Sequence, residues 1–432
     1  MLPITEIAKQ MKAAAPFVAA MEANRRSEAL LGAAALLREN AEEIFRENEK
    51  DMALSDSLAL PLKKRLRFDR PKLETVCRGL EELAALPDPV GTVTLRRELD
   101  RDLVLSRISV PIGVIGVVFE SRPDALVQIS GLCFRSGNCA ILKGGSEALH
   151  TNRILFSLMR QASLSAGFPE AAYALAETRE EIGELLACDA WVDLLIPRGS
   201  NAFVRYIMDH TRIPVLGHAA GVCHIYVDAA ADLARAAKIV LDAKTQYPAA
   251  CNAVETLLVA RPVAPVFFAI LTGRIKAFEA ENGKKIRLLG TPEAAAILSC
   301  EQAGEDDFGH EFSDLTLAVK LVADVDEAID HINRFGSHHT DAILTEDDVA
   351  AERFFRLVDS AGVYRNCSTR FADGYRYGFG AEVGISTSKI HARGPVGVEG
   401  LLTYKYLIEG TGQTVGEYAN GSRSFHFRDL PC

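Results

Sequence analysis

Short β-branched runs alternate with helical segments through the middle of the chain, and this alternation constrains the fold more than any other feature. Between Pro111 and Asp228 the apolar runs are Val114–Phe119, Ala140–Leu142, Val192–Ile196 and His224–Val227. A second rhythm of the same kind extends from Ala229 to about Ser388. Strands separated by helices pair in parallel, because the intervening helix returns the chain to the same end of the sheet. The sequence therefore predicts an α/β protein with two Rossmann-like lobes, each built on a parallel sheet.

The flanking segments have other patterns. Residues 5–86 carry apolar residues at helical spacing among many charges, which predicts several amphipathic helices. Residues 92–110 alternate apolar and polar side chains on both sides of a short polar turn, which predicts a projecting β-hairpin. In the tail, residues 401–408 and 424–427 also have the composition of strands. The predicted domains are 1–92 with 111–222, then 223–400, and a strand-built extension made of 93–110 and 401–432.

Composition excludes several classes of protein. The 432 residues are 48% hydrophobic and 25% charged, which suits large buried cores. The formal net charge of −10 argues against a nucleic-acid phosphate surface, and no apolar run is long enough to span a membrane. Nine cysteines, without C-x-x-C spacing, favour neither a disulfide framework nor a metal site. We therefore expect a cytoplasmic protein whose partners are small molecules and further copies of itself.

One cysteine stands where chemistry is plausible. Cys251 ends a Pro-Ala-Ala turn between a helical run and the apolar run Val254–Ala260, and Asn252 follows it. A loop cysteine without metal-ligand spacing is a candidate covalent nucleophile. The alternative is a small buried apolar residue, which is what most unpaired cysteines are.

Three polar turns follow predicted strands of the first lobe, where ligands of parallel sheets bind. The first places Arg122 after residues 114–119, and its guanidinium could pair with a carboxylate or phosphate. The second reads Lys143-Gly144-Gly145-Ser146, with glycines that allow close backbone approach and a lysine that attracts anions. The third contains Arg198 and Gly199. The alternative for Arg122 is an arginine that closes its loop through local salt bridges. The second and third turns could equally be ordinary strand-to-helix turns, because the glycine turn matches neither a G-x-G-x-x-G motif nor a P-loop.

The histidines leave alternatives open. His218, on a loop, could act as an acid or base or only bond its own turn, whereas His224 lies within an apolar run and is interpreted as structural. His338 and His339 precede Asp341, but this spacing matches no established metal-ligand pattern. We predict no metal site.

With these segments in order, the chain resembles the gamma-glutamyl phosphate reductases, a branch of the aldehyde dehydrogenase superfamily. The matching runs are residues 111–124, 141–148, 194–200, 221–228, 251–258, 339–345, 368–374, 380–387 and 391–395. They follow family order, and the last three are specific to this branch. The resemblance implies a dinucleotide-binding lobe, a catalytic lobe and a strand-built flap for assembly into a homo-oligomer.

The same resemblance implies a reaction. Members reduce L-glutamate 5-phosphate with NADPH to glutamate 5-semialdehyde and phosphate, in proline biosynthesis from glutamate. Cys251 matches the nucleophile that forms the acyl thioester, with Asn252 beside it among the catalytic residues. The backbone N–H of Cys251 and a polar group from Ser121 or Arg122 are the expected donors to the oxyanion.

Ligand contacts are also implied by the resemblance. Lys143 and Ser146, with Gly144, Gly145, Arg198 and Gly199, match the cofactor-binding turns, and a serine instead of an acid at position 146 favours NADP over NAD. Glu311, followed by Phe312, matches the acid that holds the nicotinamide ribose. The residues expected to bind the substrate are Arg122, His339, Ser368, Thr369 and Arg370, with Arg370 as the carboxylate fork.

Two departures from the wider pattern stand out. Hydrolytic aldehyde dehydrogenases carry a water-activating glutamate in the loop that here reads Gly217-His218-Ala219-Ala220, so phosphate rather than water is the expected acyl acceptor. Asp124 stands where the branch usually has asparagine, and an added negative charge there would weaken anion binding.

Two other functions remain as alternatives. One is a general NAD(P)-dependent aldehyde dehydrogenase with a different substrate, and the other is a catalytically silent homologue that serves in assembly. A transient contact with glutamate 5-kinase would suit a labile acyl phosphate. The chain itself contains no kinase domain.

Overall fold

The computed structural model describes residues 2–55, 58, 60–120, 122–178, 180–217 and 220–432, and the chain divides into two compact units. The first unit comprises Met1–Leu216, Phe379–Gly384 and Val396–Cys432, and the second comprises Gly217–Gly378 and Ile385–Pro395. The two units are described separately below. The predicted division of labour, with cofactor binding in residues 1–92 and 111–222 and catalysis in residues 223–400, stays a prediction.

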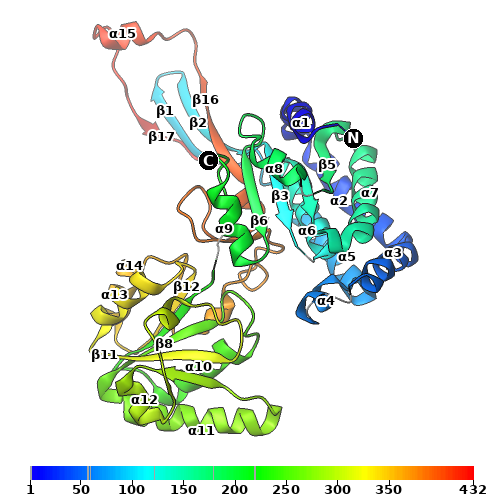
Figure 1. Cartoon of the computed structure of the whole chain (residues 1–432). Helices are drawn as coiled ribbons and strands as arrows, with labels where there is room; N and C mark the ends of the chain where they lie inside the picture. The colour runs from blue at the N-terminus through cyan, green and yellow to red at the C-terminus, as the bar shows by residue number, and fades with distance from the viewer. Residues whose placement is uncertain (1, 56–57, 59, 121, 179, 218–219) are drawn as a thin grey trace. The chain divides into compact units, whose positions relative to one another are not determined.

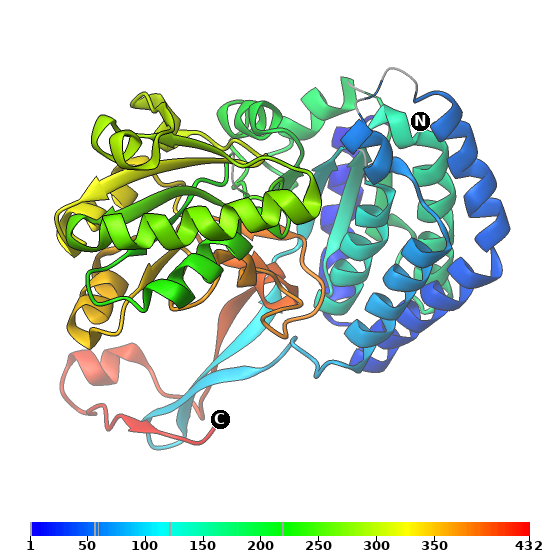
Figure 2. The ribbon, with the colours of Figure 1, turned by 90° about the horizontal axis from the view of Figure 1, so that it is seen from below.

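Helices account for more residues of the first unit than strands do. They are α1 (Ile4–Ala19), α2 (Ala23–Glu39), α3 (Ala41–Ala53), α4 (Leu60–Leu66), α5 (Arg70–Ala85), α6 (Pro123–Ser136), α7 (Leu149–Ser165), α8 (Glu180–Leu186), α9 (Asn201–Asp209) and α15 (Val415–Ala419). The α2, α3, α5, α6 and α7 helices pack on one another, as both views show in blue and cyan (Figures 1 and 2). Helix α5 begins where the Asp69 carboxylate accepts the Lys72 N–H, and α6 ends at Gly137, which has a φ of 70°.

The first unit contains two sheets. Its strands are β1 (Val93–Asp100), β2 (Leu103–Pro111), β3 (Val114–Phe119), β4 (Cys139–Gly144), β5 (Tyr173–Ala176), β6 (Leu194–Arg198), β16 (Leu402–Glu409) and β17 (Arg428–Asp429). The order β5-β4-β3-β6 is parallel throughout, and both β3 and β4 are buried along their whole length. Burial on both faces explains why these strands are continuous apolar runs rather than alternating ones.

The second sheet of this unit is antiparallel, in the order β16-β2-β1-β17 (Figure 1). It contains the predicted hairpin and the predicted strand at residues 401–408. The predicted strand at residues 424–427 is wrong, because only the short β17 that follows pairs with β1. Phe425 instead stacks on Tyr418 and Phe427, with ring centroids 4.3 and 5.3 Å away, and His426 contributes one backbone bond to Leu99.

The second unit is a parallel sheet with helices on both faces. Its elements are β7 (Cys223–Val227), α10 (Leu233–Thr245), β8 (Val254–Ala260), α11 (Ala264–Asn282), β9 (Arg287–Gly290), α12 (Pro292–Leu298), β10 (Glu301–Gln302), β11 (Thr316–Val322), α13 (Val325–Phe335), β12 (Thr340–Leu344), α14 (Asp348–Leu357) and β13 (Gly362–Arg365). The strand order is β10-β9-β11-β8-β7-β12-β13. A short ladder of β14 (Gly384–Ser386) and β15 (Gly394–Val396) lies where the chain passes between the units.

The core of the second unit follows from strand alternation. Ile225 and Val227 of β7 face α10 and α11, whereas Tyr226 between them faces α13 and α14. The α/β class with parallel sheets is thus confirmed. Among the described residues, no helix combines the length and apolar character needed to cross a bilayer.

His331 on α13 is a buried histidine whose ring packs against Phe335, Phe308 and His224. Burial, helped by the neighbouring charges of His224 and Lys320, lowers the pKa of His331 to about 2. The folded protein therefore keeps this ring neutral, while an unfolded chain protonates it below its ordinary pKa of about 6.5. A lowered pKa makes stability fall with acid, by up to about 1.4 kcal/mol per pH unit for one proton.

We expect His331→Phe to remove this part of the acid sensitivity. Between about pH 6.5 and about pH 5.5, the parent protein should lose about 1 kcal/mol more unfolding free energy than the variant. Urea unfolding followed by circular dichroism measures the difference. His310→Gln, at an exposed histidine, is the control and should leave the slope of the parent unchanged. Equal slopes for the parent and His331→Phe would contradict the prediction.

Candidate active site

Cys251 lies at the amino end of β8, on the turn that connects α10 to this central strand. Its side chain is half-buried, and none of the nine cysteines forms a disulfide. The turn is closed by backbone bonds from Ala250 N to Tyr247 O, at 3.2 Å, and from Ala253 N to Ala250 O, at 2.8 Å. A partly exposed thiol on a fixed turn is the environment of a reactive cysteine rather than of a core residue.

Asn252 holds this turn in place. Its Nδ2 donates to the backbone oxygen of Ala372 at 2.8 Å, and the Thr369 hydroxyl donates to the backbone oxygen of Asn252 at 2.7 Å. Both Asn252 and Thr369 are buried. These bonds join the Cys251 turn to the segment 368–372, which contains the predicted substrate-binding residues 368–370. In the structure Asn252 acts as a clamp, and its catalytic role stays a prediction.

Gly221 and Cys223, just before and at the start of β7, pack against the backbone of Cys251. The Cys223 thiol donates to the backbone oxygen of Cys251 at 3.3 Å. A Cβ built on Gly221 would lie 2.1 Å from that oxygen and 2.6 Å from the Cβ of Cys251. Only glycine fits here, since real Cβ atoms do not approach so closely. The sequence analysis did not single out Gly221.

His339 reaches the thiol directly. Its Nε2 lies 3.2 Å from the Cys251 Sγ, and its Nδ1 lies 3.0 Å from the Thr340 hydroxyl. The ring is fully buried. The sequence analysis placed His339 among the substrate-binding residues, whereas the structure places it against the sulfur.

Arg370 lies near the same turn. Its Nε donates to the Gln246 Oε1 at 3.0 Å, and its guanidinium lies over the Tyr247 ring, 5.9 Å from the centroid. Burial and the nearby Arg376 lower the pKa of Arg370, and the thiol group of Cys251 partly opposes this effect. An arginine remains charged regardless, so the turn has a fixed positive neighbour. Ser368 accepts the Arg370 backbone N–H and begins this short helical turn.

The predicted cofactor residues of the first unit follow β4 and β6. Lys143 and Gly144 end β4, Gly145 and Ser146 follow, and Arg198 and Gly199 end β6 and begin the next turn. From β3 the chain continues to β4 and β5 on one side, and it then crosses back to form β6 on the other side of β3. Dinucleotides bind to such sheets where the strand order reverses in this way.

The donor set at these strand ends suits an anionic dinucleotide. Lys143 is buried and donates to the Gly144 oxygen, and Arg198 adds a second cation. Packing also requires glycine at both turns. A Cβ on Gly144 would lie 2.1 Å from the Asn152 Nδ2, and a Cβ on Gly199 would lie 2.6 Å from the Glu120 Oε2. These strand ends therefore offer groups that suit phosphates and ribose: two cations, the Ser146 hydroxyl and backbone N–H groups.

Other predicted residues lie elsewhere. Arg122 stands at the first position before α6 in the first unit, whereas Ser121 and His218 lie outside the described residues. Glu311 and Phe312 lie in the second unit between a short helical turn and β11, where the Phe312 ring meets His310 edge-on at 5.0 Å.

Asp124 does not present an unpaired negative charge. Its Oδ1 lies 3.6 Å from the Lys72 Nζ of α5. His224 is structural as interpreted, since it is fully buried with its Nδ1 3.1 Å from the Asp341 carboxylate. No group of three or more metal-ligating side chains occurs in the part of the chain that the structure describes.

The sequence analysis missed a buried ion pair between α10 and β8, the elements on either side of the Cys251 turn. Lys244 of α10 and Glu255 of β8 are almost fully buried, with their Nζ and Oε2 2.5 Å apart. Burial raises the pKa of Glu255 to about 7, against the opposing charge of Lys244, and burial lowers the pKa of Lys244. In the sequence each residue looks like an ordinary surface charge, so no signal marks the pair.

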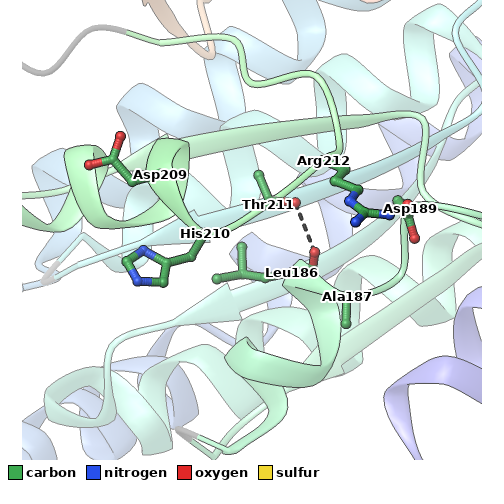
Figure 3. Close-up of a pocket in the computed structure, with 7 residues that line it drawn as sticks. All are labelled: Leu186, Ala187, Asp189, Asp209, His210, Thr211 and Arg212. Atoms are coloured by element: carbon green, nitrogen blue, oxygen red, sulfur yellow. Dashed lines mark hydrogen bonds between the residues drawn. The ribbon is translucent and has the colours of Figure 1, made fainter.

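A surface groove of about 460 Å³ in the first unit involves none of the predicted site residues (Figure 3). It is lined by Leu186, Ala187, Asp189, Asp209, His210, Thr211 and Arg212. The Thr211 hydroxyl donates to the Leu186 oxygen at 2.8 Å, and the His210 ring stacks on Tyr206. These contacts engage Thr211 and His210 in local structure.

Comparison with known proteins agrees with this geometry. A sequence model of the aldehyde dehydrogenase family matches residues 3–292, so the chain belongs to that family, whose members bind a nicotinamide cofactor. Gamma-glutamyl phosphate reductase of Pelotomaculum thermopropionicum is 52% identical over 431 residues, which cover 99% of this chain and 98% of that protein. Within the family, the chain belongs to the gamma-glutamyl phosphate reductases.

Solved structures extend the comparison. The crystal structure of gamma-glutamyl phosphate reductase from Thermotoga maritima has a TM-score of 0.91 at 35% identity, and the match covers 96% of this chain and 100% of that one. An engineered glycolyl-CoA reductase with bound NADP+ has a TM-score of 0.65 at 15% identity, covering 94% of this chain and 96% of that one. This second likeness concerns the fold alone.

We expect Gly221→Ala to displace the nucleophile without unfolding the protein. The added methyl group would push the Cys251 backbone aside, and a displacement of about 1 Å can lower turnover about 100-fold. Steady-state turnover and the rate of Cys251 alkylation measure the effect. Gly273→Ala is the control, because a Cβ at this α11 position meets nothing within 4 Å. Parent-like turnover in Gly221→Ala would refute the tight fit.

Removing Lys244 alone should be costly. Lys244→Met leaves the Glu255 carboxylate buried without its partner, at a cost of about 3–5 kcal/mol in unfolding free energy. Because the pKa of Glu255 is raised, this cost should shrink as the pH falls and the carboxyl group takes up a proton. The double variant Lys244→Met with Glu255→Leu should lie much closer to the parent. Urea unfolding of the parent, of the single variants Lys244→Met and Glu255→Leu, and of the double variant gives the coupling, and additive losses would argue against a paired site.

Proposed function

We propose that this protein reduces L-glutamate 5-phosphate with NADPH to L-glutamate 5-semialdehyde and phosphate, through a thioester on Cys251. This is the second step of proline biosynthesis from glutamate. The observation that carries the proposal is a half-buried thiol on a clamped turn, in a chain that is 52% identical to a gamma-glutamyl phosphate reductase. The sequence resemblance implies that Cys251 is the nucleophile. The acyl phosphate suits such a thiol, because phosphate is a good leaving group.

The Cys251 thiolate attacks the acyl carbon, and phosphate leaves. The negative charge that develops on the carbonyl oxygen needs fixed donors, for which we propose the backbone N–H of Cys251 together with Ser121 or Arg122. Asn252 keeps the sulfur in position through its bonds to Ala372 and Thr369. A fixed nucleophile avoids reorganisation at the moment of attack.

The amino-acid end of the substrate carries a carboxylate, and Arg370 is the proposed partner, with Ser368 and Thr369 in the same turn. The Arg370 Nε is bonded to Gln246, which orients the guanidinium so that its two terminal nitrogens form the carboxylate fork. Burial of this arginine strengthens the attraction, because few waters screen it.

We propose NADP as the cofactor, held by Lys143, Ser146 and Arg198 with the turns at Gly144–Gly145 and Gly199, and by Glu311 and Phe312 at the nicotinamide ribose. When bound, NADPH supplies the hydride that reduces the thioester. Ser146 leaves room for a 2′-phosphate where an acid would repel it. The loop 217–220 carries no carboxylate to activate water, which protects the thioester from hydrolysis.

Assembly and location are further parts of the proposal. The antiparallel sheet of β1, β2, β16 and β17 exposes Tyr404, Tyr406 and Ile408, and we propose that it mediates homo-oligomer formation. A transient contact with glutamate 5-kinase would shorten the exposure of the labile acyl phosphate to water. Cysteines that form no disulfide suit a reducing cytoplasm.

The test is the reverse reaction, with NADP+ reduction by glutamate 5-semialdehyde measured with and without phosphate. We expect strict dependence on phosphate, and a loss of at least about 1,000-fold in Cys251→Ala, since the covalent route is then closed. Cys300→Ala, at a half-buried cysteine after α12, should retain parent activity. Phosphate-independent turnover would favour a general aldehyde dehydrogenase, and equal turnover of parent and Cys251→Ala would remove the nucleophile assignment.

A further inference from the structure

We propose that His339 is a catalytic residue that takes the proton from the Cys251 thiol and passes it to the departing phosphate. The inference rests on the proposed function and deepens it. It replaces the substrate-binding role that the sequence suggested for this histidine with one in proton transfer at the reacting sulfur.

Contact with the sulfur is the first support. The Nε2 of His339 lies 3.2 Å from the Cys251 Sγ, which is hydrogen-bond distance for a nitrogen and a sulfur. A general base must be within such reach of the proton it removes. Imidazole is also the side chain whose ordinary pKa lies nearest neutral pH, so it can both accept and return a proton there.

The orientation of the ring is the second support. The Nδ1 lies 3.0 Å from the Thr340 hydroxyl, and the ring is fully buried where β12 begins. A hydroxyl partner at Nδ1 leaves Nε2 directed at the sulfur. The arrangement follows the logic of a nucleophile, a base and a third group that orients the base.

Other polar groups near this edge of the sheet are engaged in different contacts. The Asp341 carboxylate accepts from the His224 backbone N–H at 2.7 Å and from the Ser360 hydroxyl at 2.5 Å. The Cys223 thiol donates to the Cys251 backbone oxygen, and burial raises its pKa well above the ordinary value. Arg370 is a fixed cation and cannot accept a proton.

The proton balance gives His339 a defined path. As the S–C bond forms, the thiol proton moves to Nε2. The bond between the acyl carbon and the bridging phosphate oxygen then breaks, that oxygen takes the proton from Nε2, and the group leaves as hydrogen phosphate. A bound reduced nicotinamide would supply hydride to the thioester carbon. The C–S bond breaks, its electron pair returns to sulfur, and the aldehyde carbonyl forms. The thiolate regains a proton from solvent through Nε2, so one turnover consumes one proton.

His339→Gln tests the proposal, because glutamine can still bond the sulfur but cannot accept its proton. We expect kcat to fall about 100- to 10,000-fold, the range of general acid–base catalysis, with the KM for L-glutamate 5-phosphate changed less than about threefold. A substrate-binding role predicts the opposite split, with a raised KM and little change in kcat. That outcome would overturn the proposal. His338→Asn, at the neighbouring left-handed residue with φ 60°, is the matched control and should keep parent kinetics.

A second measurement needs neither turnover nor a stable variant. The rate of Cys251 alkylation by iodoacetamide in the parent protein should rise with an inflection at least about one pH unit below that of an unpaired thiol, near about 8.5. An inflection at or above that value would overturn the proposal. Because alkylation uses no substrate or cofactor, it separates the two claims: a parent protein without phosphate-dependent NADP+ reduction fails the proposed function, whatever its alkylation profile.

Discussion

The structure depends on the hydrogen bonds that fix the Cys251 turn to the segment 368–372. Asn252 supplies the junction, since its side chain bonds Ala372 and its backbone oxygen accepts from Thr369. Segments more than a hundred residues apart are thereby locked together, and the thiol inherits the rigidity of β8, a strand in the middle of a seven-stranded sheet. The missing side chain at Gly221 completes the clamp, because it lets the start of β7 press against the same backbone. In this way the position of a thiol on a loop is fixed about as well as that of a side chain on a strand.

The two units place their predicted ligand groups at opposite kinds of sheet edge. In the first unit, Lys143 and Arg198 end β4 and β6, at the carboxyl edge where ligands of parallel sheets ordinarily bind. In the second unit, Gly221, Cys251 and His339 each precede a strand, namely β7, β8 and β12, and these strands are direct neighbours. Residues 88 positions apart, such as Cys251 and His339, therefore meet at the amino edge. Strand adjacency, which no local pattern reports, brings the base to the nucleophile.

Periodicity was sufficient for the architecture, because strands buried on both faces must be apolar and their helices amphipathic. The runs at 114–119 and 254–260 coincide with β3 and β8. Periodicity failed at residues 424–427, where Phe425 and Phe427 have the spacing of a strand. Phe425 instead stacks on Tyr418. Within the site, the resemblance pointed to Cys251 and to residues 368–370, and the structure joins these two segments through Asn252. The contact of His339 with the sulfur and the Lys244–Glu255 pair were out of reach. Both arise between elements whose pairing is set by the whole sheet, and each residue taken alone has an unremarkable sequence context.

The charged side chains near the Cys251 turn are arranged so that a thiolate there would have a positive neighbour. Glu255 is the second residue of β8 and follows Cys251 by four positions in the sequence, and an uncompensated carboxylate there would oppose a second negative charge at sulfur. Lys244 neutralises it within the core, at 2.5 Å, so the pair contributes little net field at the thiol. Arg370, buried and permanently charged, then remains as a positive neighbour of the turn. A dianionic acyl phosphate and a thiolate repel one another, so a positive neighbour favours their approach in the proposed reaction. By cancelling the charge of Glu255, the buried pair removes a further repulsion that would act on the thiolate in that reaction.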